Sequence, residues 1–546
     1  MTVAFLLAAL PTRVVQTTNG PIEGLPAAGG VERFLGVPYA RPPLRFAPPT
    51  PHSNWTEVRS AQAHGHCCVP GNQFGYLQGS EDCLVLDVYA PSKQADKPRP
   101  VLVWLYGGSF LAGCIKSYDA TNLSATSGAI VVLVNYRLSV LGYLGLPELL
   151  SAGQPTNVGL LDMTMGLKWA RDNALAFGGD PSRVSLFGQS AGGAAVSFQL
   201  TMPAAKGLFH AAILQSAGGR KGWVEDLKEN DNDAMSAEEI AYNAEQLATS
   251  RGCGATPGAA RLACLRNLSL AALLAEPFGR FAPGVDGISV NHVPLHAVRL
   301  GLWHRDVDVI VGSTSCESCA GEGMLIPPGK PRVMSQAEYT RALNQTFGAA
   351  RFREPVDISP AAVARWYGDY KARRGVWQTL TRIASDNSHA CNAHLLVRAF
   401  LASSNATVRR YEFRAAGGHP GQTYPGAVHA SELEYIFRSG VPYQPSKLTP
   451  QQDALGAQMQ RMWGEFAAGS LTDTTWPACT PSSVLGADIQ HDIQRAWGSS
   501  KSLVLSPEQC DHVALLDTPT VTFGTEADVD DGSAVENCAH WDQFMR

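Results

Sequence analysis

One segment organises the whole chain: Ser182-Arg183-Val184-Ser185-Leu186-Phe187-Gly188-Gln189-Ser190-Ala191-Gly192-Gly193. It predicts a short apolar strand, a sharp turn with Ser190 at its tip, and a helix that begins on small residues. Because Gly188 and Gly192 lack a Cβ, the strand and the helix can approach closely beside the serine. The helix N-terminus brings free N–H groups and a partial positive charge to that point. The backbone N–H of Ala191 is therefore placed to help hold an oxyanion.

The pentapeptide Gly-x-Ser-x-Gly alone is a modest signal, because a chain with 53 glycines can match it by chance as an ordinary strand–helix turn. The surrounding pattern carries more weight. Apolar runs of buried-strand type alternate with helical segments, which predicts a mainly parallel sheet covered by helices on both faces. The expected strands are residues 101–106, 129–136, 211–215, 307–311, 408–413 and 502–505, and the expected helices include 162–177 and 451–466.

Four further segments complete the expected organisation. Residues 14–43, with a turn at Asn19-Gly20, predict an antiparallel region before the parallel sheet. Residues 224–283 and 324–380 are helical and loop-rich, which favours cap insertions over the strand ends, where such sheets build their sites. Gly107-Gly108-Ser109-Phe110 follows the first buried strand. A glycine pair there either exposes backbone N–H groups for an oxyanion or forms a plain turn.

Composition limits the classes of function. The 546 residues are 45% hydrophobic and 17% charged, which is typical of a globular protein with a large core. A net charge of −5 provides no basic surface for nucleic acid. No window of the sequence approaches a transmembrane span.

Several features favour a secreted protein. The apolar run Met1–Leu10 resembles the core of a signal peptide without its charged first part; a buried first strand or a truncated start are the alternatives. The chain has 12 cysteines, and an oxidising compartment would allow them to pair. It also has five glycosylation sequons, which begin at Asn54, Asn122, Asn267, Asn344 and Asn405.

The motifs together resemble the type-B carboxylesterase and cholinesterase-like family of the α/β-hydrolase superfamily. The resemblance covers residues 14–541, expected as a single domain, with residues 1–13 as a degenerate signal segment. It implies the α/β-hydrolase fold, with a mostly parallel central sheet and helical cap insertions. The matching pieces are Phe34-Leu35-Gly36-Val37-Pro38-Tyr39-Ala40, Ser80-Glu81-Asp82-Cys83-Leu84, Trp104-Leu105-Tyr106-Gly107-Gly108-Ser109-Phe110, Asn135-Tyr136-Arg137, Phe187-Gly188-Gln189-Ser190-Ala191-Gly192-Gly193 and His429-Ala430-Ser431-Glu432-Leu433.

The resemblance implies a Ser–Glu–His triad that hydrolyses carboxylic esters through an acyl-enzyme. Ser190 matches the nucleophile, His429 the general base and then acid, and Glu317 the carboxylate that orients the histidine. Glu322 is a rival carboxylate, but it falls later and outside the motif. His389 and His419 are set aside because neither lies in a matching motif.

The resemblance also assigns supporting residues. Gly107, Gly108, Ser109 and Ala191 match the oxyanion hole, although Ser109 replaces the third glycine of the usual run. The remaining matches are Gln189, Ser216 and Glu432 around the triad, and Trp223, Ile288 and Val290 on the walls of the acyl pocket.

Cysteine pairing also comes from the resemblance, since spacing alone does not fix it. It implies bonds of Cys83 with Cys67 or Cys68, of Cys253 with Cys264, and of Cys391 with Cys510. Cys316 and Cys319 flank Glu317, either as a local bridge or as core thiols. Cys114, Cys479 and Cys538 are left without an assigned partner.

Departures from the family pattern favour a general carboxylesterase. Gln189 replaces the usual glutamate before the nucleophile, and the loop between Cys68 and Cys83 lacks both a Trp for choline and a long lipase lid. The alternatives are a cholinesterase-like or lipase-like specificity, or a silent adhesion homologue, which the presence of all three triad residues disfavours. We expect a small-molecule ester as the substrate, no cofactor or metal for the reaction, and a monomer or homodimer.

Overall fold

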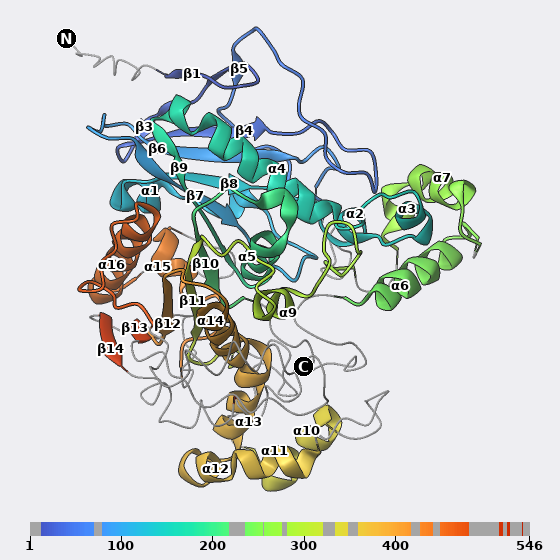
Figure 1. Cartoon of the computed structure of the whole chain (residues 1–546), viewed down its shortest axis with the longest axis vertical. Helices are drawn as coiled ribbons and strands as arrows, with labels where there is room; N and C mark the ends of the chain where they lie inside the picture. Colours follow the sequence, from blue (N-terminus) through green and yellow to red (C-terminus); the bar gives the residue numbers. More distant parts are fainter. Residues whose placement is uncertain are drawn as a thin grey trace, which may run out of the picture.

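The computed structural model of the protein describes residues 12–69, 79–217, 235–254, 256–275, 281–319, 334–347, 359–415, 426–439, 448–479, 513–516, 521–524 and 538. In that part of the chain, a large twisted sheet runs through the molecule between two layers of helices (Figure 1). A small sheet near the N-terminus is formed by β1 (Val14–Gln16), β2 (Pro21–Glu23) and β5 (Arg59–Ser60).

The central sheet is parallel in its middle and antiparallel at both edges. Its order is β14-β13-β12-β11-β10-β9-β7-β8-β6-β4-β3, and every pair from β8 to β13 is parallel. This confirms the expected mostly parallel sheet. The strands are β3 (Leu25–Ala28), β4 (Val31–Pro38), β6 (Val85–Pro91), β7 (Arg99–Leu105), β8 (Ile130–Val134), β9 (Gly179–Gln189), β10 (Ala211–Gln215), β11 (Asp308–Thr314), β12 (Val408–Phe413), β13 (Val513–Leu516) and β14 (Val521–Gly524).

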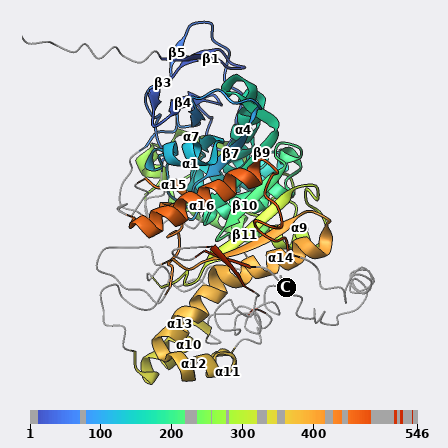
Figure 2. The same ribbon diagram turned by 90° about the vertical axis from the view of Figure 1, so that its left-hand side faces the viewer.

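Apolar strands explain why the middle of the sheet is covered on both faces. All residues of β8, Ile-Val-Val-Leu-Val, are buried, and so are all residues of β10 and β12. Parallel strands of this kind need helices on each side to exclude water. In Figure 1 the helices α1 (Thr121–Ser127), α15 (Leu433–Phe437) and α16 (Pro450–Ala467) lie on one side, which Figure 2 turns toward the viewer. The opposite side carries α4 (Val158–Asn173), α5 (Ala191–Thr201), α9 (Pro294–Arg299) and α14 (Cys391–Ser403).

The other helices of the described chain form two groups. The first group comprises α2 (Ser139–Tyr143), α3 (Pro147–Ser151), α6 (Ala237–Ser250), α7 (Ala259–Asn267) and α8 (Leu270–Leu273). A second group projects from the far end of the molecule in both views and comprises α10 (Gln336–Phe347), α11 (Pro360–Trp366), α12 (Gly368–Arg374) and α13 (Val376–Ser385). The described parts of residues 224–283 and 324–380 are thus largely helical, as expected.

Most predicted elements agree with the structure to within a few residues. The expected helix 162–177 begins earlier, at Val158, and its last turn is a 3₁₀ segment, Ala174–Phe177. The expected strand 502–505 lies outside the described residues, as does the apolar run 1–10. Among the helices that are described, none combines the length and apolar character needed to cross a bilayer.

One predicted disulfide is wrong. Cys391 pairs with Cys538 and not with Cys510, because the Cα atoms of Cys391 and Cys538 lie 5.0 Å apart, within the range that a disulfide requires. The expected pairs Cys68–Cys83 and Cys253–Cys264 are present. Cys67 pairs with Cys114, which the sequence left unassigned, and Cys316 pairs with Cys319.

Candidate active site

Strand register brings the predicted site residues to one end of the sheet. Gln189 of β9 lies opposite Gln215 of β10, and Gln215 lies opposite Gly312 of β11. The carboxyl edge of the sheet therefore holds the residues that follow these strands, which are Ser190, Ser216 and the turn with Glu317. This edge is where open α/β sheets bind ligands.

The backbone at Ser190 is strained. Its φ and ψ are 57° and −125°, an uncommon conformation for a residue with a side chain. A Cβ on Gly188 would lie 2.4 Å from the carbonyl oxygen of Gly192, and one on Gly192 would lie 2.0 Å from that of Leu105. Only glycine fits at either position, so the strand can turn sharply into α5 and leave Ser190 at the tip.

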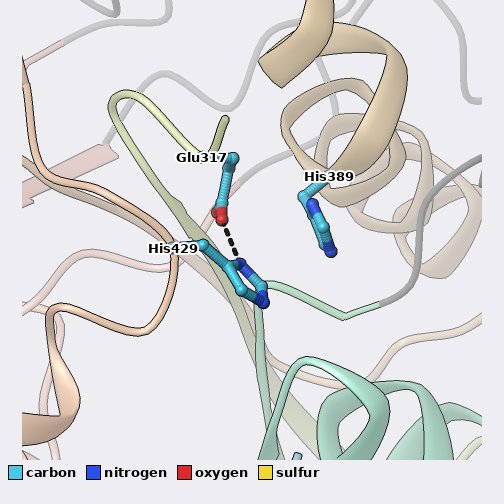
Figure 3. A group of neighbouring side chains, drawn as sticks. All are labelled: Glu317, His389 and His429. Carbon is cyan, nitrogen blue, oxygen red and sulfur yellow. Dashed lines mark hydrogen bonds and ion pairs between the residues drawn. The ribbon is translucent and has the colours of Figure 1, made fainter. Parts of the chain in front are cut away.

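Glu317 and His429 form a direct pair at the end of β11. The Oε2 atom of Glu317 lies 2.5 Å from Nδ1 of His429, as Figure 3 shows. The other carboxylate oxygen accepts hydrogen bonds of 2.7 Å from the hydroxyl of Ser216 and of 2.7 Å from the backbone N–H of Thr314. The backbone N–H of His429 also donates to the carbonyl of Glu317, at 3.3 Å. Side chain and backbone therefore both fix the histidine relative to the carboxylate.

Glu317 is ionised at neutral pH although it is buried. Burial alone would raise its pKa, but the charge and hydrogen bond of His429, with smaller effects of His389 and Ser216, lower the pKa to about 2. A permanent negative charge at this point can hold the proton of His429 on Nδ1. The lone pair of His429 is then on Nε2, the nitrogen away from Glu317.

The predicted oxyanion residues lie on a second strained turn, after β7. Gly108, Ser109 and Phe110 have φ values of 122°, 57° and 59°. A Cβ on Gly107 would lie 2.9 Å from the Cβ of Ser190, so this turn reaches the serine directly. Within the described chain, no protein group accepts the N–H of Gly108, Ser109 or Ala191. These N–H groups are available to a ligand.

Gln189 and Glu432 both lie near the Glu317–His429 pair. The side-chain nitrogen of Gln189 lies 3.3 Å from Nε2 of His429. Glu432 is fully buried, and its Oε1 accepts a hydrogen bond of 3.4 Å from Gln215. Burial, together with the nearby charge of Glu317, raises the pKa of Glu432 to about 7.

The acyl-pocket assignments remain predictions. Trp223 lies outside the described residues, as do the rival carboxylate Glu322 and His419. Val290 is buried in the main core, whereas the side chain of Ile288 is 40% exposed.

His389, which the sequence set aside, lies beside the pair. Its ring centroid is 4.5 Å from that of His429, with the ring planes tilted by 33°. Burial, with the nearby charge of His429, lowers the pKa of His389 to about 4, so it is neutral at neutral pH. A π-helical turn places it there, and no motif in the sequence marks such a turn.

The sheet, the strained Gly-x-Ser-x-Gly turn and the buried carboxylate–histidine pair define an α/β-hydrolase. A family model extends this conclusion: the chain belongs to the carboxylesterase family, whose model matches residues 11–503. The protein is a carboxylic ester hydrolase.

Known proteins resemble the chain over most of its length. The acetylcholinesterase of Bungarus fasciatus is 31% identical, with 87% of this chain and 83% of that protein covered. Fumonisin B1 esterase of Sphingopyxis macrogoltabida is 31% identical, with 86% of this chain and 84% of that protein covered. Cocaine esterase of Homo sapiens is 31% identical, with 81% of this chain and 80% of that protein covered. Among solved structures, a thermophilic PNB esterase has a TM-score of 0.71 at 26% identity, with 96% of this chain and 99% of that chain covered.

Proposed function

We propose that the enzyme cleaves neutral carboxylic esters through an acyl-enzyme on Ser190. Oγ of Ser190 attacks the ester carbonyl carbon while its proton passes to Nε2 of His429. His429 then returns the proton to the leaving alcohol, which departs and leaves the acyl group on Ser190. Water, activated by the same histidine, hydrolyses the acyl-enzyme and restores the hydroxyl.

The observation that carries this proposal is the Glu317–His429 pair at the sheet edge that ends in Ser190. Glu317 is ionised, accepts from Nδ1 and is itself held by Ser216 and Thr314. It can therefore stabilise the imidazolium that forms when His429 takes the serine proton. The N–H groups of Gly108, Ser109 and Ala191, which no group in the described part of the chain accepts, can stabilise the negative oxygen of the tetrahedral intermediate.

A neutral ester is the substrate class that the site favours. The relatives are named for different esters, so their names do not indicate which ester this enzyme cleaves. Gln189 is uncharged and lies against Nε2 of His429, so the position before the nucleophile offers no carboxylate to a cation. The segment from Cys68 to Cys83 contains no Trp that could form a cation–π contact.

We infer that the enzyme works outside the cell. The structure contains disulfides on several elements, including Cys67–Cys114, Cys253–Cys264 and Cys391–Cys538. Such bonds persist in oxidising compartments and are rare in the cytosol. Detection of glycans at the five sequons of the secreted protein would test this inference.

An organophosphate tests the mechanism directly. It should attach to Ser190 and abolish hydrolysis, and Ser190→Ala should lower kcat by roughly 10⁴-fold or more, because the triad acts as a unit. Circular dichroism should show that the variant is folded. Peptide mapping that places the adduct on another serine would overturn the assignment.

A further inference from the structure

His389 brings a second imidazole to the catalytic histidine. It lies on the π-helical turn Asp386–Ala390 between α13 and α14, and a buried network holds the start of this turn. The carboxylate of Asp386 accepts hydrogen bonds from Arg382 at 2.8 Å and from Tyr367 at 2.7 Å. The extra residue of a π turn changes the direction of the side chains that follow. Here it directs His389 toward His429.

The polar atoms of His389 are not used by the described protein. Its Nδ1 is buried and has no hydrogen-bond partner among the described residues. The ring as a whole is only partly buried. In Figure 3 the His389 ring lies beside that of His429, whose second nitrogen points away from the Glu317 carboxylate. The two rings therefore offer nitrogen atoms to the same space.

Glu317 and His429 already have the arrangement found behind metal-binding histidines. A histidine ligand usually donates its other N–H to a carboxylate, which fixes the tautomer and makes the free nitrogen more basic. Glu317 does this for His429 at 2.5 Å. Nε2 of His429 is then the ligand atom, and Glu317 supports it from behind. An ion at Nε2 displaces the side-chain nitrogen of Gln189, which lies 3.3 Å from that atom.

The three side chains are close enough for the two imidazoles to share one ion once the His389 ring has turned. Ligand atoms of Glu317, His389 and His429 all lie within 4.8 Å of one another. Two nitrogens on one tetrahedral zinc ion lie roughly 3.3 Å apart, because each Zn–N bond is about 2.0–2.1 Å. Rotation of the partly exposed His389 ring can close this gap, and water can complete the coordination shell.

We propose that His389 and His429 form an inhibitory site for a divalent cation that prefers imidazole, such as Zn²⁺ or Cu²⁺. Imidazole suits these ions, whereas Mg²⁺ and Ca²⁺ prefer oxygen ligands. The bound ion occupies the lone pair of His429 that must accept the proton of Ser190. Ester hydrolysis stops until the ion is removed. The inhibition rests on the proposed function, but the binding of the ion does not.

Calorimetry with zinc chloride tests the binding without turnover. Ser190→Ala should bind Zn²⁺ at this site, and the added change His389→Phe should weaken that binding by at least about tenfold, since one of two protein ligands is lost. Phenylalanine keeps an aromatic ring against His429 and removes only the nitrogens. His296→Phe is the matched control, because His292 and His296 form another histidine contact, with ring centroids 5.6 Å apart. His296→Phe should leave the binding of Zn²⁺ unchanged.

Inhibition of the active enzyme provides the second measurement. Zn²⁺ should inhibit the wild type and a chelator should restore it, while Mg²⁺ has no effect. Measured relative to its own activity without metal, His389→Phe should need at least about tenfold more Zn²⁺ for half-inhibition than the wild type. Equal sensitivity of wild type and His389→Phe would overturn the proposal. Binding that depends on His389 but does not inhibit would instead overturn the role of His429 as the base.

Discussion

Glu317 is a buried carboxylate that its neighbours keep charged. With a folded-state pKa of about 2 and an ordinary value of 4.5, its contribution to stability is present above about pH 4.5 and is lost as the pH falls toward 2. Glu317 therefore does not titrate in the range where esterases are assayed. We therefore expect any fall in activity on the acid side to come from another group, and the proposed base His429 is the candidate.

Replacing Glu317 with glutamine tests this charge. Glu317→Gln keeps the shape and removes the support for the imidazolium, so kcat should fall by about 10³–10⁴-fold. The wild-type kcat/KM should rise between about pH 5 and 8 and show no step from Glu317. Near wild-type activity of Glu317→Gln, with a collapse in Glu322→Gln, would move the role to Glu322.

Glu432 and Glu434 allow a matched comparison of buried carboxylates. The pKa of each is raised to about 7, for Glu434 by burial alone and for Glu432 by burial and the charge of Glu317. A raised carboxylate pKa means that the folded state holds a proton that the unfolded state has released. Stability is then lost as the pH rises from about 4.5 to about 7.

Glu432→Gln should therefore stabilise the protein at pH 8 more than at pH 5, by on the order of 1–3 kcal/mol. Thermal unfolding at the two pH values measures the difference. Glu434→Gln should change stability in the same direction and leave the pH profile of kcat unaltered, because only Glu432 acts on Glu317. An equal gain in stability at both pH values for Glu432→Gln would contradict the raised pKa.

At the scale of structural elements, the disulfide Cys316–Cys319 closes the turn that carries Glu317. It encloses Glu317 in sequence, and the two cysteines pack with Val428, the residue before His429, and with Trp377. The backbone N–H of Cys316 donates to the carbonyl of Ala427 at 2.9 Å. The disulfide therefore fixes the turn of the carboxylate, and this turn packs and hydrogen-bonds against the loop of the histidine.

Removing the Cys316–Cys319 disulfide should lower kcat and have only a small effect on the free energy of unfolding. In Cys316→Ala/Cys319→Ala we expect kcat to fall by about tenfold or more, since small misplacement of a catalytic group costs up to about 10²-fold. Cys253→Ala/Cys264→Ala is the control: it opens a longer loop between α6 and α7 and should lose about 3 kcal/mol of stability with kcat unchanged. An unchanged kcat in the first variant would show that the bond does not position Glu317.

Elements were predictable where local sequence determines them. The apolar runs became β7, β8, β10, β11 and β12, and the glycines around Ser190 predicted a strained turn because no other residue fits there. Features that depend on distant contacts were not predictable. The partner of Cys391 depends on the path of the chain to Cys538, 147 residues later, and His389 reaches the site through a π turn without a sequence signature.

The net charge of −5, spread over 546 residues, gives the whole molecule only a weak attraction for cations at long range. Its preference among esters must therefore come from the site. A choline ester needs an aromatic face or a carboxylate to replace the water around its fixed cation. Gln189 provides neither where it contacts His429.

We therefore expect a neutral short-chain ester to have a higher kcat/KM than the choline ester of the same acid. A cation–π contact is worth roughly 0.5–2 kcal/mol, and about 1.36 kcal/mol of transition-state stabilisation is tenfold in rate. Because the site lacks both the contact and the carboxylate, its kcat/KM for the choline ester should be lower than that of a cholinesterase site by about ten- to several hundredfold. An uncharged isostere of choline as the alcohol corrects for leaving-group reactivity. If the choline ester exceeds that isostere by about tenfold or more, the enzyme contains a cation site and the neutral-ester proposal is wrong.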